Sequence, residues 1–391
     1  MVAAGHTHTV LLRSDGTAVA CGWNDFGQCD VPALGEGLTY TQVAAGYAHT
    51  VLLRSDGTAA ACGLNDRGQC DVPAPGEGLT YTQVAARDEH TILLRSDGTA
   101  AACGRYYNYG QCDVPALGED LTYTQVASGG AHTVLLRSDG TAAACGCNDC
   151  GQCDVPALGE GITYTQVAAG GAHTVLLRSD GTAAACGYYG AGQCDVPALG
   201  EGLTYTQVAA GVRYTVLMRS DGTAAACGGC NEYGQCDVPA LGEGLTCTQV
   251  AAGGTHTVLL RSDGTAAACG CNEYGQCDVP ALGEGLSYTQ PQALPTLLLQ
   301  ASFDGASVQF LTLGGEEFGR VPAAPADDLS DVRARLRAGR VSRTLRCSAI
   351  DAVLPGGRLL SRAPRGETCA AAFGRADDVG PGREGQKMSA E

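Results

Sequence analysis

The residues in this 391-residue chain that could do chemistry recur at regular intervals, and histidine is the first of them. Imidazole nitrogens bind zinc when several donors converge on one ion. Histidines that recur once in each repeat would instead be spread around the molecule. We therefore expect buried histidines that hydrogen bond to the backbone at the start of a strand, with Tyr214 in the same place in one repeat. The recurring histidines are His8, His49, His90, His132, His173 and His256.

A pair of cysteines also occurs in every repeat, beginning with Cys21 and Cys29. Such pairs could form disulfides or bind a metal ion. Nothing at the N-terminus reads as a secretion signal, so we expect free thiols that act as small hydrophobic side chains. The stretch "CGCNDCGQC" is similar to a zinc knuckle, but only Cys147 and Cys150 are additions to the repeat pattern. The sequence therefore predicts no metal site.

The tetrapeptide "RSDG" places an arginine and an aspartate together seven times, first as Arg13 and Asp15. Asp-Gly between two apolar runs is a strong signal for a β-hairpin with a two-residue turn, because both turn positions favour positive φ, and this explains the aspartate without catalysis. An active site needs different groups that converge from different elements. The chain contains no nucleophile elbow, phosphate-binding loop or helical metal motif. We expect no enzyme activity, no catalytic residue and no cofactor.

These residues stand on strands of a repeat that is 41 or 42 residues long. Each repeat holds three strand-like runs, "LTYTQVAAG", "HTVLLR" and "TAAACG", and "VPAL" fits a fourth, outer strand. Four strands in about 41 residues make one propeller blade. The sequence predicts an all-β fold, a seven-bladed β-propeller of four-stranded blades over residues 2–290. Its repeats begin at Val2, Val43, Val84, Val126, Val167, Val208 and Val250.

The pattern "VAAG…HTVLL..DG…CG.N..GQ" resembles the repeat of the regulator of chromosome condensation family, whose members form seven-bladed propellers. The ending "GQ..VPA" is most similar to a bacterial-type branch that includes a secreted beta-lactamase inhibitory protein. This chain has Cys21 and Gly22 where the family usually has Trp-Gly, and its only tryptophan, Trp23, follows one position later. A role that depends on a tryptophan cluster, such as light sensing, is therefore not implied.

The two ends of the repeat region predict how the ring closes. The first repeat lacks the "LTYTQ" that precedes the other six, and a spare "LSYTQ" follows the last repeat at 286–290. We expect this segment to lie beside Val2–Gly5 and to complete the first blade, because an open edge strand invites unwanted pairing. The alternative is an eighth, partial repeat in a truncated sequence.

The charge of the chain is −17 and belongs to the repeats. Up to residue 290 there are 11 arginines and 29 acidic residues, 11 − 29 = −18, and the remainder has 13 − 12 = +1. Such a surface repels phosphate, so we expect no nucleic-acid binding. No apolar run reaches the roughly 18 residues of a membrane span. We expect a monomer that binds no membrane and lies in the cytoplasm or nucleus.

The repeats differ from one another just after "VAAG" and between "CG" and "GQ". Because the loops after the first and third strands of an up-and-down blade emerge on the same side, the variable residues should share one face. Aromatic residues and arginine are typical of interface hot spots, although drift in loops would also produce variation. The predicted partner-binding face comprises Trp23, Phe26, Tyr47, Arg67, Arg87, Asp88, Glu89, Arg105, Tyr106, Tyr107, Tyr109, Tyr188, Tyr189, Arg213, Tyr233 and Tyr274.

These features predict a non-enzymatic scaffold that binds another protein. The resemblance leaves two alternatives open, guanine-nucleotide exchange on a small GTPase and inhibition of an enzyme. Exchange uses protrusions on the disk, for which repeats of nearly uniform length leave little room.

After Pro291 the composition changes. Two strand-like runs flank Gly314 and Gly315, a helical pattern ends at Gly339, and another strand-like run leads to a glycine turn. This order is similar to the ubiquitin-like β-grasp, over residues 296–365, and implies an adaptor or substrate-binding role linked to ubiquitin pathways. The di-glycine end needed for conjugation is absent. Residues 366–391 are expected to be disordered.

Overall fold

The computed structural model describes residues 1–104, 109–229 and 231–288, and the backbone of four further strands between 297 and 353. The chain divides into two compact units, Met1–Pro291 and Gln292–Glu391. No helix in the described part is long and apolar enough to cross a membrane.

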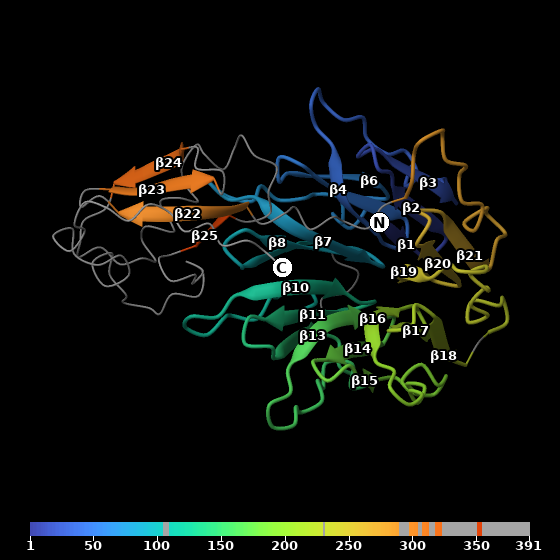
Figure 1. Cartoon of the computed structure of the whole chain (residues 1–391). Helices are drawn as coiled ribbons and strands as arrows, with labels where there is room; N and C mark the ends of the chain where they lie inside the picture. Colours follow the sequence, from blue (N-terminus) through green and yellow to red (C-terminus); the bar gives the residue numbers. More distant parts are fainter. Residues whose placement is uncertain are drawn as a thin grey trace. The chain divides into compact units, whose positions relative to one another are not determined.

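The first unit is a ring of seven antiparallel sheets with three strands each, which follow one another in chain order (Figure 1). We number these sheets as blades one to seven. The first four blades are β1 (Val2–Ala4), β2 (His8–Leu12) and β3 (Ala18–Gly22); β4 (Tyr40–Ala45), β5 (His49–Arg54) and β6 (Ala59–Gly63); β7 (Tyr81–Arg87), β8 (His90–Arg95) and β9 (Ala100–Cys103); and β10 (Tyr123–Ser128), β11 (His132–Arg137) and β12 (Ala142–Gly146). The last three are β13 (Tyr164–Ala169), β14 (His173–Arg178) and β15 (Ala183–Gly187); β16 (Tyr205–Ala210), β17 (Tyr214–Arg219) and β18 (Ala224–Gly228); and β19 (Cys247–Ala252), β20 (His256–Arg261) and β21 (Ala266–Gly270).

The hydrophobic core lies between the blades. Val10 and Leu12 of blade one pack against Tyr40, Val43 and Leu52 of blade two, and equivalent residues fill the six other interfaces. The middle strand of each sheet is buried on both sides, which suits its β-branched and leucine side chains. Each fully buried leucine contributes about 1.5–3 kcal/mol to stability. The first strands of neighbouring blades contact one another and therefore lie innermost.

The "SDG" hairpin is present in each blade, with a turn geometry that differs from the one we expected. In blade one the Gly16 N–H donates to Arg13 O at 3.0 Å, and the Arg13 N–H donates to Thr17 O at 2.8 Å. Only the glycine, with φ of 80°, has positive φ in this turn. The Asp15 carboxylate accepts hydrogen bonds from both the N–H and the hydroxyl of Thr17. The loop is thus a turn closed by a glycine bulge rather than a two-residue mirror-image turn.

The predicted fourth strand is not formed, which corrects the four-stranded blade. The "DVPAL" segment of blade one makes local turn hydrogen bonds instead, from Asp30 N to Gly27 O and from Val31 N to Cys29 O. Pro32 has no N–H for a strand ladder, and its carbonyl accepts a hydrogen bond from the Tyr40 hydroxyl at 2.6 Å. The same contact ties six of the seven blades to the start of the next one, and at the start of blade seven Cys247 replaces the tyrosine.

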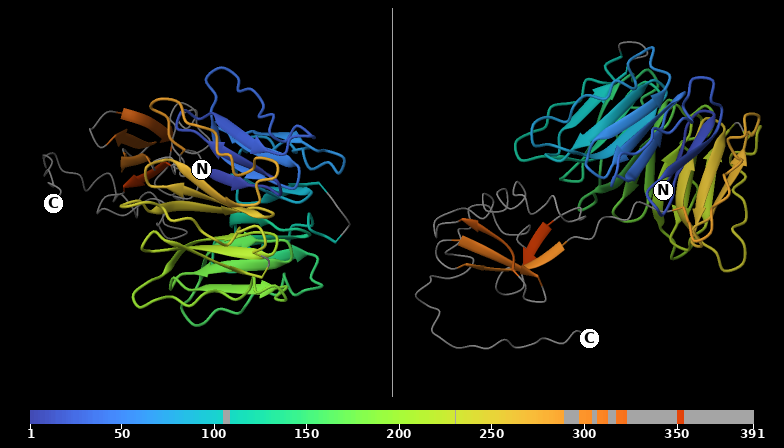
Figure 2. Two further views of the ribbon diagram at one scale, coloured as in Figure 1. Left: turned by 90° about the vertical axis from the view of Figure 1, so that its right-hand side faces the viewer. Right: turned by 90° about the horizontal axis from the view of Figure 1, so that it is seen from above.

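Ring closure follows the prediction. Tyr288 forms an isolated bridge with Arg13, in the register that pairs Tyr40 with Arg54 in blade two. Tyr288 also lies in the core cluster between blades seven and one, together with Val2. The views in Figure 2 show the blue first sheet beside the yellow last one. The end of the repeat region therefore completes the blade with which it begins.

The second unit contains one four-stranded sheet in the order β24-β23-β22-β25. The strands β22 (Leu297–Phe303), β23 (Ser307–Thr312) and β24 (Glu317–Pro322) form antiparallel pairs, and β25 (Ile350–Val353) pairs parallel to β22. The expected hairpin around Gly314 and Gly315 is confirmed as β23 and β24. The predicted helix and the tail 366–391 lie outside the described residues, and the β-grasp assignment stays a prediction.

Candidate functional site

The recurring histidines form a belt of hydrogen bonds between the blades. His8 Nε2 lies 2.9 Å from Thr50 Oγ1 of blade two, and that hydroxyl donates to the carbonyl of Gln28 at 2.8 Å. Because the hydroxyl proton is used in this way, the Thr50 oxygen accepts a hydrogen bond from the N–H of His8 Nε2. The five other histidines make the same contact to the next blade. The prediction of buried histidines is confirmed, but their partner is a threonine side chain rather than the backbone.

Burial keeps these histidines neutral. It lowers the pKa of His8, His49, His132 and His173 to about 3, and that of His256 to about 4. The Nδ1 atoms have no hydrogen-bond partner among the described residues, so a second proton would find no acceptor. The belt is therefore a structural device and leaves the imidazoles unavailable to a metal ion.

Cys21 and Cys29 of blade one are free thiols in the structure. Cys21 Sγ lies 3.9 Å from the carbonyl of Gln276 in blade seven, and Cys29 Sγ lies 3.4 Å from the carbonyl of Trp23. Burial raises the pKa of Cys21 to about 12 and that of Cys29 to about 11. Within the part of the chain that the structure describes, no group of histidine, cysteine or acidic residues could hold a metal ion.

The variable residues stand on loops that share much of an internal framework, although blade five has Tyr189 in place of its asparagine. In blade one, Asn24 accepts a hydrogen bond from Cys29 N and donates one to the Asp30 carboxylate. The buried Gln28 accepts a hydrogen bond from the Phe26 N–H at 3.1 Å. The equivalent glutamines of five other blades hold the corresponding N–H at 3.0–3.3 Å, among them those of Arg67, Cys150 and Tyr274. The framework thus presents side chains of several kinds at the same place in these blades.

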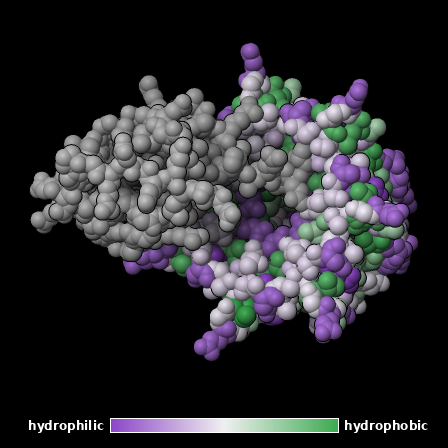
Figure 3. All heavy atoms as spheres, viewed as in Figure 1, coloured by the Kyte–Doolittle hydropathy of each residue, from purple (hydrophilic) through white to green (hydrophobic). Residues whose placement is uncertain are grey.

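Many of these variable side chains are exposed aromatic rings. Tyr189 is 79 % exposed, and Tyr188, Tyr109, Tyr233 and Phe26 are between 44 % and 49 % exposed. The part of the ring visible in Figure 3 mixes hydrophilic and hydrophobic residues in small areas. Exposed rings on such a surface are candidates for binding, because burial of a tyrosine ring against a partner is more favourable than its exposure to water.

Rings from three consecutive blades gather around Trp23. The Trp23 ring centroid lies 5.1 Å from that of Phe26, 6.1 Å from that of Tyr274 and 6.3 Å from that of Tyr47. His6 lies 4.8 Å from Tyr47 and extends the group. We call these five residues the aromatic cluster. His6 was missing from the predicted face, although it occupies the same variable position as Tyr47 and could have been found by aligning the repeats.

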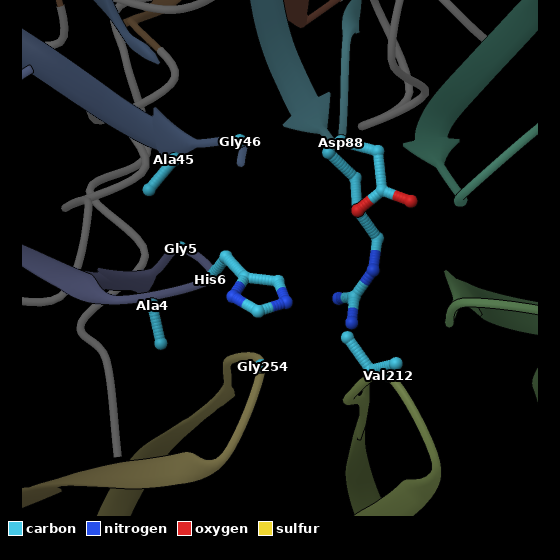
Figure 4. Close-up of a pocket in the computed structure, with 9 residues that line it drawn as sticks. Ala4, Gly5, His6, Ala45, Gly46, Asp88, Val212 and Gly254 are labelled. Atoms are coloured by element: carbon cyan, nitrogen blue, oxygen red, sulfur yellow. The ribbon is translucent and has the colours of Figure 1, made fainter. Parts of the chain in front are cut away.

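A small cavity lies where the loops after the first strands meet. His6, Asp88, Val212 and Gly254, from four different blades, surround it in Figure 4. Its volume is about 10 Å³, which is room for about one water molecule. A drug-sized or nucleotide-sized ligand does not fit here.

Blade three departs most from the repeat at this place. Arg87 stands where most blades have glycine, and its Nη1 donates to the carbonyl of Ala210 in blade six at 2.7 Å. The side chain therefore links two blades across the ring, which differs from the exposed contact residue that we expected. Next to it Asp88 has a positive φ of 41° and accepts a hydrogen bond from Tyr47 N.

The structure describes some of the remaining residues of the predicted face. Glu89 forms an ion pair with Arg67 at 3.7 Å, and Arg213 is exposed. Arg105, Tyr106 and Tyr107 lie outside the described residues. The structure thus brings the variable residues of neighbouring blades together, while their use in binding stays a prediction.

The model of the Regulator of chromosome condensation (RCC1) repeat matches residues 2–28, 40–69, 123–152 and 247–276. No curated protein matches the chain at a significant level of sequence similarity. Among solved structures, Prp20p from Saccharomyces cerevisiae is 18% identical, with 72% of this chain and 85% of that chain covered and a TM-score of 0.58.

Two further structures have the same fold. Human WBSCR16 is 19% identical, covers 66% of this chain and 85% of that chain, and has a TM-score of 0.56. Yeast RCC1 (Prp20) bound to Kap60 is 19% identical, covers 65% of this chain and 74% of that chain, and has a TM-score of 0.53. The first unit is therefore an RCC1-like repeat propeller.

Proposed function

We propose that the propeller is a non-enzymatic scaffold that binds another protein through its variable loops. The observation that carries this proposal is that these loops combine a backbone held by a buried glutamine with exposed side chains that vary between blades. Buried amides such as Gln28 bind the loop backbone in the same way in six blades, and the side chains at that position vary, with Phe26 and Arg67 among them. Rigid loops with exposed tyrosine, phenylalanine and arginine side chains lose little entropy on binding and are typical of protein interfaces.

The structural neighbours support a protein partner. Yeast RCC1 (Prp20) was crystallised bound to Kap60, and Prp20p is described by its binding to Gsp1p and histones. We transfer only the class of partner to this chain. The cavity at the centre of the loops holds about one water molecule, which is too small for a substrate, and this favours binding over catalysis.

Affinity capture with the full chain as bait tests the proposal. Tyr188→Ser with Tyr189→Ser, and separately Tyr106→Ala with Tyr107→Ala, remove aromatic side chains from the variable loops. Glu160→Gln with Glu201→Gln is the matched control. These exposed carboxylates lie on the connections between blades, which end beside the "SDG" turns at the other side of the ring. We expect loss of specific partners with a loop variant only. Recovery of identical partners with every variant would contradict the proposal.

Guanine-nucleotide exchange is the second candidate function. It predicts that a small GTPase is among the captured proteins and that its release of a fluorescent nucleotide accelerates when the full chain is added. Enzyme inhibition predicts that an enzyme is captured and that its activity falls when a stoichiometric amount of the chain is added. A link to ubiquitin pathways would depend on the second unit, and the proposal does not extend to it.

A further inference from the structure

The aromatic cluster on blades seven, one and two has the composition of a site for a cationic group. Trp23 is its centre, with the rings of Phe26, Tyr47 and Tyr274 within 6.3 Å between centroids. Tyr274 is 53 % exposed and Phe26 is 44 % exposed, so the edge of the cluster is open to a partner. Indole has the most favourable ring face for a cation–π contact.

Carboxylates lie next to the Phe26 and Tyr274 rings of the cluster, while Arg87 lies near His6 and donates its Nη1 to the carbonyl of Ala210. Asp25 and Glu273 are exposed and precede Phe26 and Tyr274 in their loops. The loops that carry the five rings, 5–7, 23–28, 46–48 and 271–276, contain no arginine or lysine. Burial lowers the pKa of His6, so the imidazole adds no positive charge at neutral pH. The propeller as a whole carries −18, which attracts a basic partner over a longer range.

Building on the proposed function, we propose that the aromatic cluster binds an arginine-bearing, flexible segment of a basic protein. A guanidinium group stacks on Trp23 and Tyr274, and its N–H donors pair with the carboxylates of Asp25 and Glu273. Arginine fits better than lysine, because its planar group combines stacking on a ring with two-pronged hydrogen bonds to a carboxylate. The buried glutamines of these loops bind the backbone of Phe26 and Tyr274 and so fix the position of both residues before the partner arrives.

The single tryptophan makes the test direct. Trp23 is the only tryptophan in the chain, so tryptophan emission reports on the cluster alone. The full chain is titrated with an end-capped heptapeptide of alternating glycine and arginine, and with the same peptide containing citrulline or lysine. We expect a saturable change in emission with the arginine peptide and binding at least tenfold weaker with citrulline, which keeps the shape but lacks the charge. Added salt should weaken binding of the arginine peptide, because salt screens the attraction between opposite charges.

Calorimetry on variants locates the peptide. We expect Tyr274→Ala, and separately Asp25→Asn with Glu273→Gln, to weaken binding at least fivefold. Glu160→Gln with Glu201→Gln removes two exposed carboxylates outside the variable loops and is the matched control for the charge variant, expected to stay within twofold. Unchanged thermal unfolding of each variant shows that the ring is intact. No saturable signal up to about 1 mM peptide, or equal binding of the citrulline peptide, would overturn the proposal.

The two proposals fail in different ways. If the loop variants lose their captured partner but no arginine peptide binds Trp23, the protein-binding function stands and the cationic site is wrong. If the loop variants retain every partner, the protein-binding function itself is wrong. Sedimentation of the free chain identifies a third outcome, in which a dimer lost on Trp23→Ala would assign the cluster to a second copy of this chain and overturn the basic-segment proposal.

Discussion

Acidification should unfold the propeller well above the pH at which carboxylates titrate. The perturbation is a change from pH 7.5 to pH 5.5. In the folded ring the pKa values of the six belt histidines are lowered to about 3 or about 4 by burial. The unfolded chain has ordinary histidines with pKa values of about 6.5. Between these values the unfolded state binds more protons, so stability falls as the pH is lowered through 6.5.

The magnitude follows from the number of histidines in the belt. At pH 5.5 an unfolded histidine is about ten-elevenths protonated, which costs the folded state about 1.4 kcal/mol per histidine relative to pH 7.5. Six histidines together lower the free energy of unfolding by about 8 kcal/mol. Because a whole domain is stable by about 5–15 kcal/mol, the ring should be close to its unfolding midpoint at pH 5.5.

Urea unfolding, monitored by Trp23 emission, measures the free energy of unfolding at each pH. The single tryptophan reports on the propeller and not on the second unit. The pH dependence near 5.5 should correspond to uptake of about five protons on unfolding. His173→Gln is the control, because an amide still donates toward Thr215 but does not titrate. It should reduce the uptake by about one proton. A change below about 2 kcal/mol between pH 7.5 and 5.5 would refute the reasoning.

Three further changes have defined outcomes. Gly46→Ala should cost more than about 2 kcal/mol, since its Cβ would lie 2.1 Å from the His49 ring; an unchanged urea midpoint would contradict this. Arg87→Ala should lower the free energy of unfolding by about 1–3 kcal/mol through loss of the hydrogen bond across the ring, measured in the same assay. The exposed thiol of Cys150 should react with iodoacetamide at pH 8 faster than Cys21, whose pKa is raised to about 12; peptide mass spectrometry gives both rates, and equal rates would be inconsistent with the burial of Cys21.

Much of the fold could be predicted from the sequence because its determinants are local. The period of 41 or 42 residues, the apolar runs and the Asp-Gly turn all act within one repeat, and they identified three strands and their hairpins. The fourth strand was wrong because the apolar pattern of "VPAL" does not show that its backbone is used elsewhere. The N–H groups of Asp30 and Val31 bond within local turns, and the carbonyl of Pro32 accepts from the Tyr40 hydroxyl at the start of the next blade.

The candidate site shows the same division. The sequence by itself determined which residues vary, Trp23 and Tyr274 among them, and that they follow the first and third strands. Only the tertiary structure decided that these two rings, 251 positions apart, lie 6.1 Å from each other, and that Arg87 turns inward to Ala210. The physical reason is ring closure. Blade seven meets blade one through Tyr288, Val2 and their core, so neighbours in space are set by the circular packing of blades and not by distance along the chain.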